Sequence, residues 1–344
     1  MYSFANDYSE GAHPKILEQI VKTNLEQTGV YFSDEYCSSA ETLIKKACGK
    51  PKAKVHFFMG GTQANATIIS SALRSFQGVY SSALGHINTH EAGAIEYGGH
   101  KILTLPDEDG KLTAQQIEFS HQLYLNDPKK EHWVQPKMVY ISQPTELGTL
   151  YSKQELTALA TVCRKYDLFL FLDGARLGYA LTSPNNDVSL EDIADLCDVF
   201  YIGGTKCGLL FGEAAVIVSP LLQADFHTIM KQHGAVLAKG RLLGLQFETL
   251  FTNNLYEQIC SYGIKQALRI KNAFQAKGIS FYTNSFTNQQ FPILTNEQYH
   301  ILKQKYVMGV WEELPNNRLA IRFCTSWATK ESEVSALLAD IATL

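Results

Sequence analysis

Two short apolar segments in the middle of the chain each end in a polar residue of a kind used in catalysis. Residues 169–172 (Phe-Leu-Phe-Leu) are followed by Asp173, and residues 201–204 (Tyr-Ile-Gly-Gly) are followed by Thr205 and Lys206. Apolar runs of this length beside glycine are typical of strands buried on both faces of a parallel sheet. Open sheets of this kind bind ligands in a crevice outside the carboxyl ends of their strands. We therefore expect Asp173 and Lys206 to face one ligand-binding crevice.

An aspartate and a lysine in one crevice suit a pyridine-based cofactor, pyridoxal 5'-phosphate (PLP). A lysine amine forms a Schiff base with the aldehyde of this cofactor, and a carboxylate keeps its ring nitrogen protonated. Burial of Lys206 after an apolar strand would lower the pKa of its amine and leave more of it neutral and nucleophilic. Taken alone, each residue also has an ordinary explanation, Asp173 as the cap of a turn and Lys206 as a solvated surface residue. The two together make PLP the working hypothesis.

The order of strand-like and helix-like segments predicts an α/β fold. Between residues 54 and 218 apolar strand-like runs alternate with helical patterns, which is typical of a mostly parallel sheet between helices. The seven strands are expected at residues 54–58, 79–82, 101–105, 137–142, 168–172, 199–202 and 214–218. A long helix is expected at residues 247–277, followed by antiparallel strands and two more helices. We therefore expect a large domain (residues 12–246) and a small α+β domain (residues 1–11 and 247–344).

The composition is that of an ordinary globular enzyme. The chain has 344 residues, 45% of them hydrophobic and 19% charged, with a net charge of −4. This charge gives no reason to expect nucleic acid or an anionic membrane as a partner, and the apolar stretches are too short to span a bilayer. The seven cysteines are odd in number and contain no Cys-x-x-Cys, which favours reduced thiols. Because the amino terminus also lacks the features of a secretory signal, we expect a cytoplasmic protein.

A glycine-rich turn at residues 60–65 (Gly-Gly-Thr-Gln-Ala-Asn) is a candidate phosphate site. It follows a predicted strand and opens a predicted helix. Gly61 lets the backbone approach an anion, the helix start offers free N–H groups, and Thr62 adds a hydroxyl. The turn matches neither the dinucleotide-binding glycine pattern nor the Walker motif. A plain strand-to-helix turn explains this segment equally well when it is considered alone.

Two histidines, His86 and His90, lie four residues apart after a glycine. In a helix they would share one face, which makes a zinc site conceivable, but the sequence offers no third ligand nearby and we expect no metal. A flat imidazole stacked on a flat cofactor ring is the better explanation. An ordinary, partly buried and hydrogen-bonded histidine remains an alternative of similar weight for each residue.

Arginines complete the set of candidate residues. Arg176 follows Asp173 by three residues, so it can share the crevice and bind a carboxylate or a phosphate. Arg322 lies within an apolar strand-like run, where burial of its charge is costly unless the guanidinium is paired. A substrate carboxylate matches guanidinium geometry. A structural salt bridge is the rival explanation for Arg322, and a solvated surface position is the rival for Arg176.

In this order along the chain, the features resemble the threonine aldolase family of PLP enzymes, which is grouped with the β-eliminating lyases. The matching motifs are residues 61–65, 85–94, 173–177 and 205–206, and the resemblance extends from Asn6 to the strand that contains Arg322. The resemblance implies PLP fold type I, with a large, mostly parallel seven-stranded sheet between helices and a small α+β domain. It also implies a homodimer or homotetramer whose active site lies at the subunit interface.

The resemblance implies specific roles around the cofactor. Lys206 would form the Schiff base, Asp173 would pair with the ring nitrogen, and His86 would stack on the ring. The family's phosphate-binding arginine from the neighbouring subunit has no clean match here, and either Lys239 or Arg241 can take its place. The remaining cofactor contacts would come from Gly61, Thr62 and Thr205.

Five further residues are implied to contact the amino-acid substrate. Arg176 and Arg322 would bind its carboxylate, assisted by Asn6, where the family commonly has serine. Tyr31 would reach the site at the dimer interface. His132 lies roughly where the family has a histidine that contacts the β-hydroxyl group. The family's Glu-Asn-Thr-His stretch is replaced by Gln-Pro-Thr-Glu at residues 143–146.

The predicted activity is cleavage of L-threonine, L-allo-threonine or related β-hydroxy-α-amino acids to glycine and an aldehyde. The base for the β-hydroxyl proton is expected to be His86 or a water molecule near His132. The main alternative is another fold type I reaction on an amino acid, namely β-elimination, transamination or racemisation. A non-catalytic relative is disfavoured because both Lys206 and Asp173 are present. An NAD-dependent oxidoreductase is disfavoured because the glycine fingerprint is missing.

Overall fold

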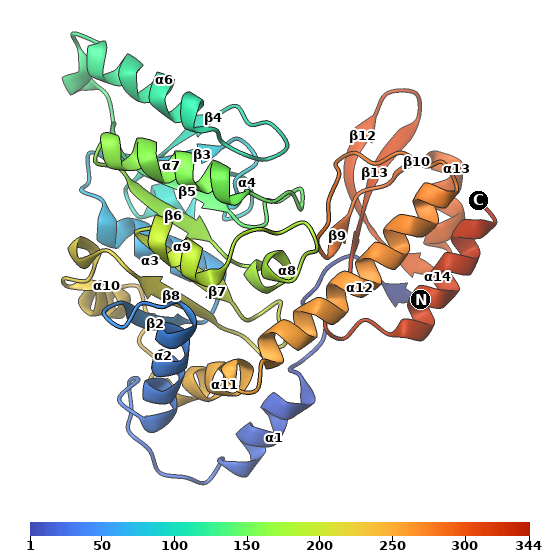
Figure 1. Cartoon of the computed structure of the whole chain (residues 1–344), viewed down its shortest axis with the longest axis horizontal. Coiled ribbons are helices and arrows are strands. Elements are labelled where there is room, and N and C mark those ends of the chain that lie inside the picture. The colour runs from blue at the N-terminus through green and yellow to red at the C-terminus, as the bar shows by residue number, and fades with distance from the viewer.

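A seven-stranded sheet forms the centre of the large domain in the computed structural model, which describes all of residues 1–344 (Figure 1). The strand order is β2-β8-β7-β6-β5-β3-β4, and only β8 runs against the others. The strands are β2 (Lys54–Phe58), β3 (Gln77–Ser82), β4 (Lys101–Leu105), β5 (Gln135–Ser142), β6 (Phe169–Asp173), β7 (Val199–Gly203) and β8 (Glu213–Ile217). The predicted α/β class, with seven strands at these places, is confirmed.

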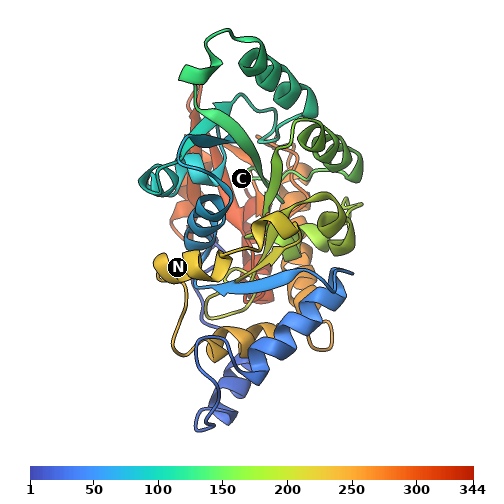
Figure 2. The same cartoon turned by 90° about the vertical axis from the view of Figure 1, so that its left-hand side faces the viewer.

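Helices cover both faces of this sheet (Figure 2). Alternate residues of β6 point to opposite sides, so that Leu170 and Leu172 belong to one hydrophobic core and Phe171 to the other. The helices of the large domain are α1 (Pro14–Lys22), α2 (Glu35–Ala47), α3 (Gly61–Ala72), α4 (His86–Thr89), α5 (Ala94–Tyr97), α6 (Ala114–Asn126), α7 (Lys153–Lys165), α8 (Leu177–Leu181), α9 (Leu190–Leu196), α10 (Phe226–Gln232) and α11 (Arg241–Phe251), with 3-10 turns η1 (Lys130–His132) and η2 (Pro220–Leu222). Because both faces are covered, the central strands β6 and β7 are apolar up to their last residues.

The small domain packs on α12 (Leu255–Ala276), the long helix that crosses from one domain to the other in Figure 1. An antiparallel sheet is formed by β9 (Gln289–Gln290), β10 (Ile293–Thr295), β12 (Gly309–Leu314) and β13 (Arg318–Cys324). The other elements are α13 (Asn296–Lys303), α14 (Glu331–Ala342) and the parallel pair β1 (Tyr2–Ser3) and β11 (Tyr306–Val307). The amino-terminal residues thus join this domain, and Phe4 is buried in its core.

The prediction of one continuous helix at residues 247–277 is wrong, because the structure has two helices there, α11 and α12. Asn253 and Asn254 between the two helices have φ angles of 54° and 56°. Asparagine tolerates this left-handed conformation better than most residues, and a helix cannot continue through it. None of the helices is both long enough and apolar enough to cross a membrane.

Strand order explains how residues far apart in sequence come together. Strand β6 is central, with β7 on one side and β5 and then β3 on the other. These four strands run parallel, so the segments that follow them emerge at the same edge of the sheet. Asp173 ends β6, and Lys206 follows β7. The sequence prediction that these two residues face one crevice is therefore satisfied by the topology.

Candidate active site

A cavity of about 180 Å³ lies at the carboxyl ends of these strands. It brings together seven residues predicted from the sequence, namely Gly61, Thr62, His86, Asp173, Arg176, Thr205 and Lys206. Its lining also contains residues to which the sequence analysis gave no role, among them Ser142, Glu146, Tyr201 and Glu213. A larger surface groove of about 600 Å³ beside α2, α8 and α11 contains none of the predicted site residues.

Asp173 is held as a carboxylate by three donors. Asn65 Nδ2 lies 3.1 Å from Oδ2, the Tyr140 hydroxyl donates to the same oxygen, and the Ala175 N–H lies 3.0 Å from Oδ1. Burial alone would raise the pKa of Asp173, but the nearby His86 imidazole and the hydroxyl donors hold it below its ordinary value. Asp173 therefore offers a buried negative charge in the cavity, which suits a protonated ring nitrogen.

His86 is tied to Asp173 through a chain of buried side chains. Its Nδ1 lies 2.8 Å from Glu91 Oε1, and Asn65 Nδ2 donates both to this oxygen, at 2.7 Å, and to Asp173. Burial alone would lower the pKa of His86, but the carboxylates of Glu91 and Asp173 raise it above the ordinary value. Asn65 and Glu91 lie inside sequence motifs that were recognised, but their role became visible only in the structure.

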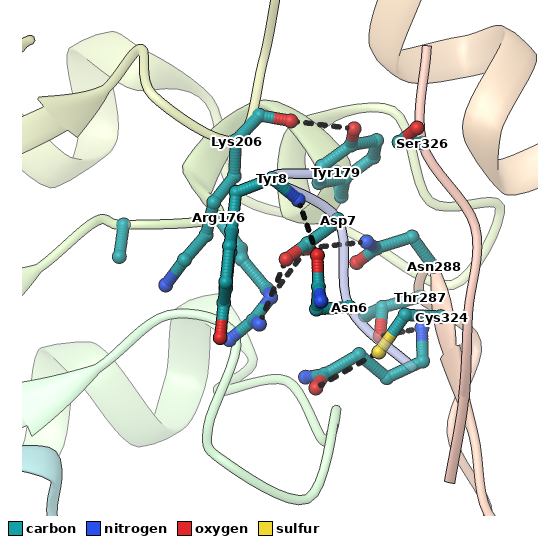
Figure 3. Close-up of polar contacts among 12 residues, drawn as sticks. Asn6, Asp7, Tyr8, Arg176, Tyr179, Lys206, Thr287, Asn288, Cys324 and Ser326 are labelled. Carbon is teal, nitrogen blue, oxygen red and sulfur yellow. Dashed lines mark hydrogen bonds and ion pairs between the residues drawn. The ribbon is translucent and has the colours of Figure 1, made fainter. Parts of the chain in front are cut away.

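Lys206 makes no ion pair, although it faces a cavity rich in carboxyl groups. Burial, and then the charge of Arg176, lower the pKa of its amine. Figure 3 shows Lys206 beside Tyr8 and Arg176, with its backbone carbonyl accepting a hydrogen bond of 2.8 Å from the Tyr179 hydroxyl. A larger share of this amine is consequently neutral and able to act as a nucleophile.

Glu213 on β8 fixes the turn that presents the lysine. Its carboxyl oxygens accept hydrogen bonds from the Thr205 hydroxyl at 2.8 Å and the Gly204 N–H at 3.1 Å. The Thr205 hydroxyl in turn accepts one of 3.0 Å from the Gly212 N–H. Burial raises the pKa of Glu213 to about 8. This carboxyl is therefore largely protonated at neutral pH, unlike that of Asp173.

Glu213→Gln should raise stability at pH 8 and not at pH 5. The carboxyl pKa of about 8 in the folded protein exceeds the ordinary value of 4.5, so between these values only the folded state holds the proton. Its contribution is complete below pH 4.5 and is lost as the pH rises through 8, whereas glutamine does not titrate. Urea unfolding of both proteins without cofactor should give the variant an advantage of roughly 1 kcal/mol or more at pH 8. An equal difference at both pH values would contradict this assignment.

The start of α3 forms an open anion cradle. No side chain caps the helix at Gly60, and the N–H groups of Gly61 and Thr62 have no partner in the protein. A Cβ atom at Gly60 would meet nothing within 4 Å, whereas one at Gly61 would lie 3.0 Å from the Tyr201 hydroxyl. A side chain at position 61 would therefore crowd the Tyr201 hydroxyl, and glycine avoids this contact. Free N–H groups at a helix start are suited to phosphate.

Arg176 is bound by a partner that the sequence analysis missed. Its Nε and Nη2 lie 2.7 Å and 3.0 Å from the two carboxylate oxygens of Asp7, and Asn288 Nδ2 lies 2.8 Å from Asp7 Oδ2 (Figure 3). Burial would raise the pKa of Asp7, but the adjoining guanidinium lowers it. Two of the three guanidinium nitrogens of Arg176 are thus occupied, so this residue anchors the amino-terminal segment to the cavity wall. Asn6, in the same segment, accepts a hydrogen bond of 3.0 Å from the Tyr8 N–H.

Arg322 has no carboxylate partner. Its Nη2 donates to the Ala5 carbonyl at 3.1 Å, while its buried Nε has no hydrogen-bond partner. It lines a neighbouring hollow of about 370 Å³ together with His90 and Trp311. An unpaired guanidinium of this kind is suited to an anionic ligand. The structural salt bridge that was considered for Arg322 is absent.

His132 does not line the cavity of its own chain. His132 is exposed in η1, which precedes β5, whereas the cavity lies at the opposite ends of the strands. A residue that enters a strand and a residue that leaves it are separated by the length of the strand. The position that follows β5 and faces the cavity is occupied by Glu146 instead.

Tyr31, Lys239 and Arg241 lie outside the cavity of their own chain but close to one another. The Tyr31 N–H donates to the Ala238 carbonyl at 3.2 Å, next to the exposed Lys239. Arg241 Nη2 donates to the Thr23 carbonyl at 2.7 Å. Tyr31 is itself 47% exposed. The predicted action of these residues across a subunit interface remains a prediction.

Comparison with known proteins agrees with the site. Residues 5–272 match the family model for β-eliminating lyases. The low specificity L-threonine aldolase of Pseudomonas sp. (strain NCIMB 10558) is 28% identical over 349 residues, which cover 98% of this chain and 96% of that protein. The threonine aldolase structure from Leishmania major has a TM-score of 0.97 and 45% identity, covering 100% and 99% of the two chains. An aspartate aminotransferase of Thermus thermophilus, with a TM-score of 0.71 and 13% identity, shares the fold. The chain therefore belongs to the β-eliminating lyase family and, within it, to the threonine aldolases.

Proposed function

We propose that the protein is a PLP-dependent aldolase that cleaves L-threonine, L-allo-threonine or related β-hydroxy-α-amino acids to glycine and an aldehyde. The observation that carries this proposal is the joint presence of Lys206, Asp173 and His86 in one cavity. The pKa values of these residues support the proposal, because the pKa of the Lys206 amine and the pKa of the Asp173 carboxyl are both lowered. The names of the similar proteins from Pseudomonas and Leishmania support the substrate class.

The residues of the cavity fit PLP at each of its chemical groups. The free N–H groups of Gly61 and Thr62 would bind the phosphate, and Asp173 would hold the ring nitrogen. His86 would lie against the ring, and Lys206 would attach to the aldehyde carbon. When bound, PLP supplies a carbonyl group for the substrate amine and a ring that accepts an electron pair from the α-carbon.

Side chains of the protein would transfer protons and bind the substrate carboxylate. Lys206 would hold the cofactor until a substrate amine takes its place, and its amine would then be free to move protons. Arg322 supplies an unpaired guanidinium for the substrate carboxylate, while Arg176 stays fixed by Asp7. Orientation matters because only the bond held perpendicular to the ring plane can be broken efficiently.

We further propose a homodimer or homotetramer with the active site at the subunit interface. The support is the cluster of the exposed Tyr31 and Lys239 with the partly buried Arg241, whose cationic groups lack a carboxylate partner. A basic residue from a second subunit would complete the phosphate site, because Lys206 and Arg176 are the only lysine and arginine that line the cavity. A cytoplasmic location is proposed because all seven cysteines are unpaired and buried.

Purified protein loaded with PLP should release acetaldehyde and glycine in equal amounts from L-threonine. The aldehyde is measured by coupled reduction with NADH, and glycine is measured by amino-acid analysis. A reaction mixture that yields 2-oxobutanoate and ammonia without aldehyde would instead indicate β-elimination. Formation of a 2-oxo acid that requires an added amino-group acceptor would indicate transamination. L-Threonine and L-allo-threonine should be assayed side by side, so that the preferred configuration is measured directly.

A further inference from the structure

We propose that Glu146 is the base that removes the β-hydroxyl proton of the substrate, a role that rests on the aldolase function proposed above. Glu146 follows β5 and lines the cavity that contains Asp173 and Lys206. In the sequence Glu146 stands out only as a departure from the family pattern, and the residues alone point to His86 or to a water molecule near His132 for this step.

The strand order places Glu146 on the correct side of the cavity. Along the edge of the sheet Lys206 follows β7, Asp173 ends β6, and Glu146 follows β5. A flat ring held at Asp173 would therefore lie between Lys206 on one side and Glu146 on the other. This arrangement separates the two proton transfers. Glu146 can take the proton from the β-hydroxyl, and Lys206 can deliver a proton to the α-carbon.

The hydrogen bonds of Glu146 fix one oxygen and leave the other free. Oε1 accepts hydrogen bonds from the backbone N–H of His86 at 2.9 Å and from the Ser142 hydroxyl at 2.8 Å. Oε2 has no hydrogen-bond partner in the protein, and it is not sealed from solvent. The side chain is thus oriented by two donors and retains a lone-pair oxygen for a proton.

The other acidic groups near the cavity are already occupied. Asp173 accepts from three donors, and Asp7 is paired with Arg176. Glu91 is bound to His86 and does not line the cavity. Glu213 accepts from the backbone and side chain of the lysine turn, on the other side of Asp173. None of these four carboxyls presents a free, oriented oxygen to the cavity, because Glu91, whose Oε2 also lacks a partner, does not line it.

His86 is a weaker candidate than Glu146 for the same reason. Its Nδ1 is bound to Glu91, and the nearby carboxylates raise its pKa, which favours the protonated ring. Burial raises the pKa of Glu146, so its carboxylate is a stronger base than an ordinary glutamate. His86 would then contribute in two other ways. Its imidazole would lie against the cofactor ring, and its backbone N–H orients Glu146.

The step balances as a simple proton and electron-pair transfer. Glu146 Oε2 forms a bond to the β-hydroxyl proton, and the O–H electron pair becomes the second bond of the aldehyde carbonyl. The Cα–Cβ bond breaks, and its electron pair remains with the α-carbon, stabilised by the bound cofactor. A proton that Lys206 has taken up from the incoming substrate ammonium group then reaches the α-carbon to give glycine, and the Glu146 proton returns to solvent as the aldehyde leaves.

Glu146→Gln tests this role. Glutamine can still accept the hydrogen bonds from His86 and Ser142 but cannot take up a proton. We expect kcat for aldehyde release from L-threonine to fall by about 10²- to 10⁴-fold. The PLP dissociation constant, measured by fluorescence quenching, should stay within about threefold of the wild-type value, and so should the rate of glycine α-proton exchange in D₂O, because neither involves a β-hydroxyl group.

A matched control and two contrary outcomes make the experiment decisive. Glu118→Gln, on the exposed face of α6, should leave all three measurements unchanged. Aldehyde release by Glu146→Gln at the wild-type rate would overturn the proposal. A parallel loss of glycine exchange or PLP affinity would also overturn it, because Glu146 would then serve the cofactor. Wild-type protein that exchanges glycine but releases no aldehyde would instead refute the aldolase function itself.

Discussion

Lys206→Ala should eliminate the visible absorbance of covalently bound PLP and reduce threonine cleavage by roughly 10³-fold or more. The amine of Lys206 is the only lysine nitrogen in the cavity, and burial and Arg176 keep its pKa low. No neighbouring lysine can replace it. Absorbance titration with PLP and the coupled aldehyde assay measure the two effects.

The same variant should fold as well as the wild-type protein. A lysine whose folded-state pKa is lowered binds its proton less well than in the unfolded state, so at neutral pH it costs stability. Removing it should leave the unfolding midpoint without PLP unchanged or slightly raised. Lys165→Ala, on the exposed surface of α7, is a suitable control. Persistent covalent PLP in Lys206→Ala would show that another lysine carries the cofactor.

Three carboxyl groups in one cavity reach different protonation states through their hydrogen bonds. Asp173 receives three donors and lies near the His86 imidazole, which together outweigh burial and lower its pKa. Glu146 and Glu213 receive two donors each, and burial prevails, so their pKa values are raised. The site thus keeps a permanent anion for the ring nitrogen and two carboxyls that can carry protons.

The parts of the fold that were predicted from sequence are those with a local signal. Buried parallel strands are continuous apolar runs, so β6 and β7 were recognisable, and Asp173 and Lys206 follow from their positions at the strand ends. The break between α11 and α12 was missed because two asparagines resemble ordinary polar helix residues until their φ angles are known. Local patterns cannot show a backbone conformation that neighbouring elements impose.

The residues that were missed depend on contacts between distant parts of the chain. Asn288 and Asp7 are 281 positions apart, and Asn65 reaches Asp173 across 108 positions. Such pairings leave no periodic trace in one sequence. His132 lies before β5 and Glu146 lies after it, so Glu146 and not His132 lines the cavity. The direction of the strand, which a single sequence does not show, decides which of the two loops lies at the cavity.

Asp7→Ala should lower the free energy of unfolding by about 3–5 kcal/mol, because it leaves the buried Arg176 charge without its partner. The pKa of Asp7 is lowered in the folded state, so its contribution is present above the ordinary value of 3.8 and is lost as the pH falls through the folded-state value. Urea unfolding of the protein without cofactor at pH 7 measures the loss.

Asp7→Leu combined with Arg176→Met distinguishes pairing from packing. Replacing both charges with apolar side chains of similar size removes the unpaired guanidinium, so most of the stability lost in Asp7→Ala should return. Activity should remain low, since the amino-terminal segment beside Lys206 would no longer be held by the ion pair that Figure 3 shows. A double variant as unstable as Asp7→Ala would mean that the segment is held by shape, through Asn288 and the surrounding backbone. Recovered stability without recovered activity would show that this pair positions the site.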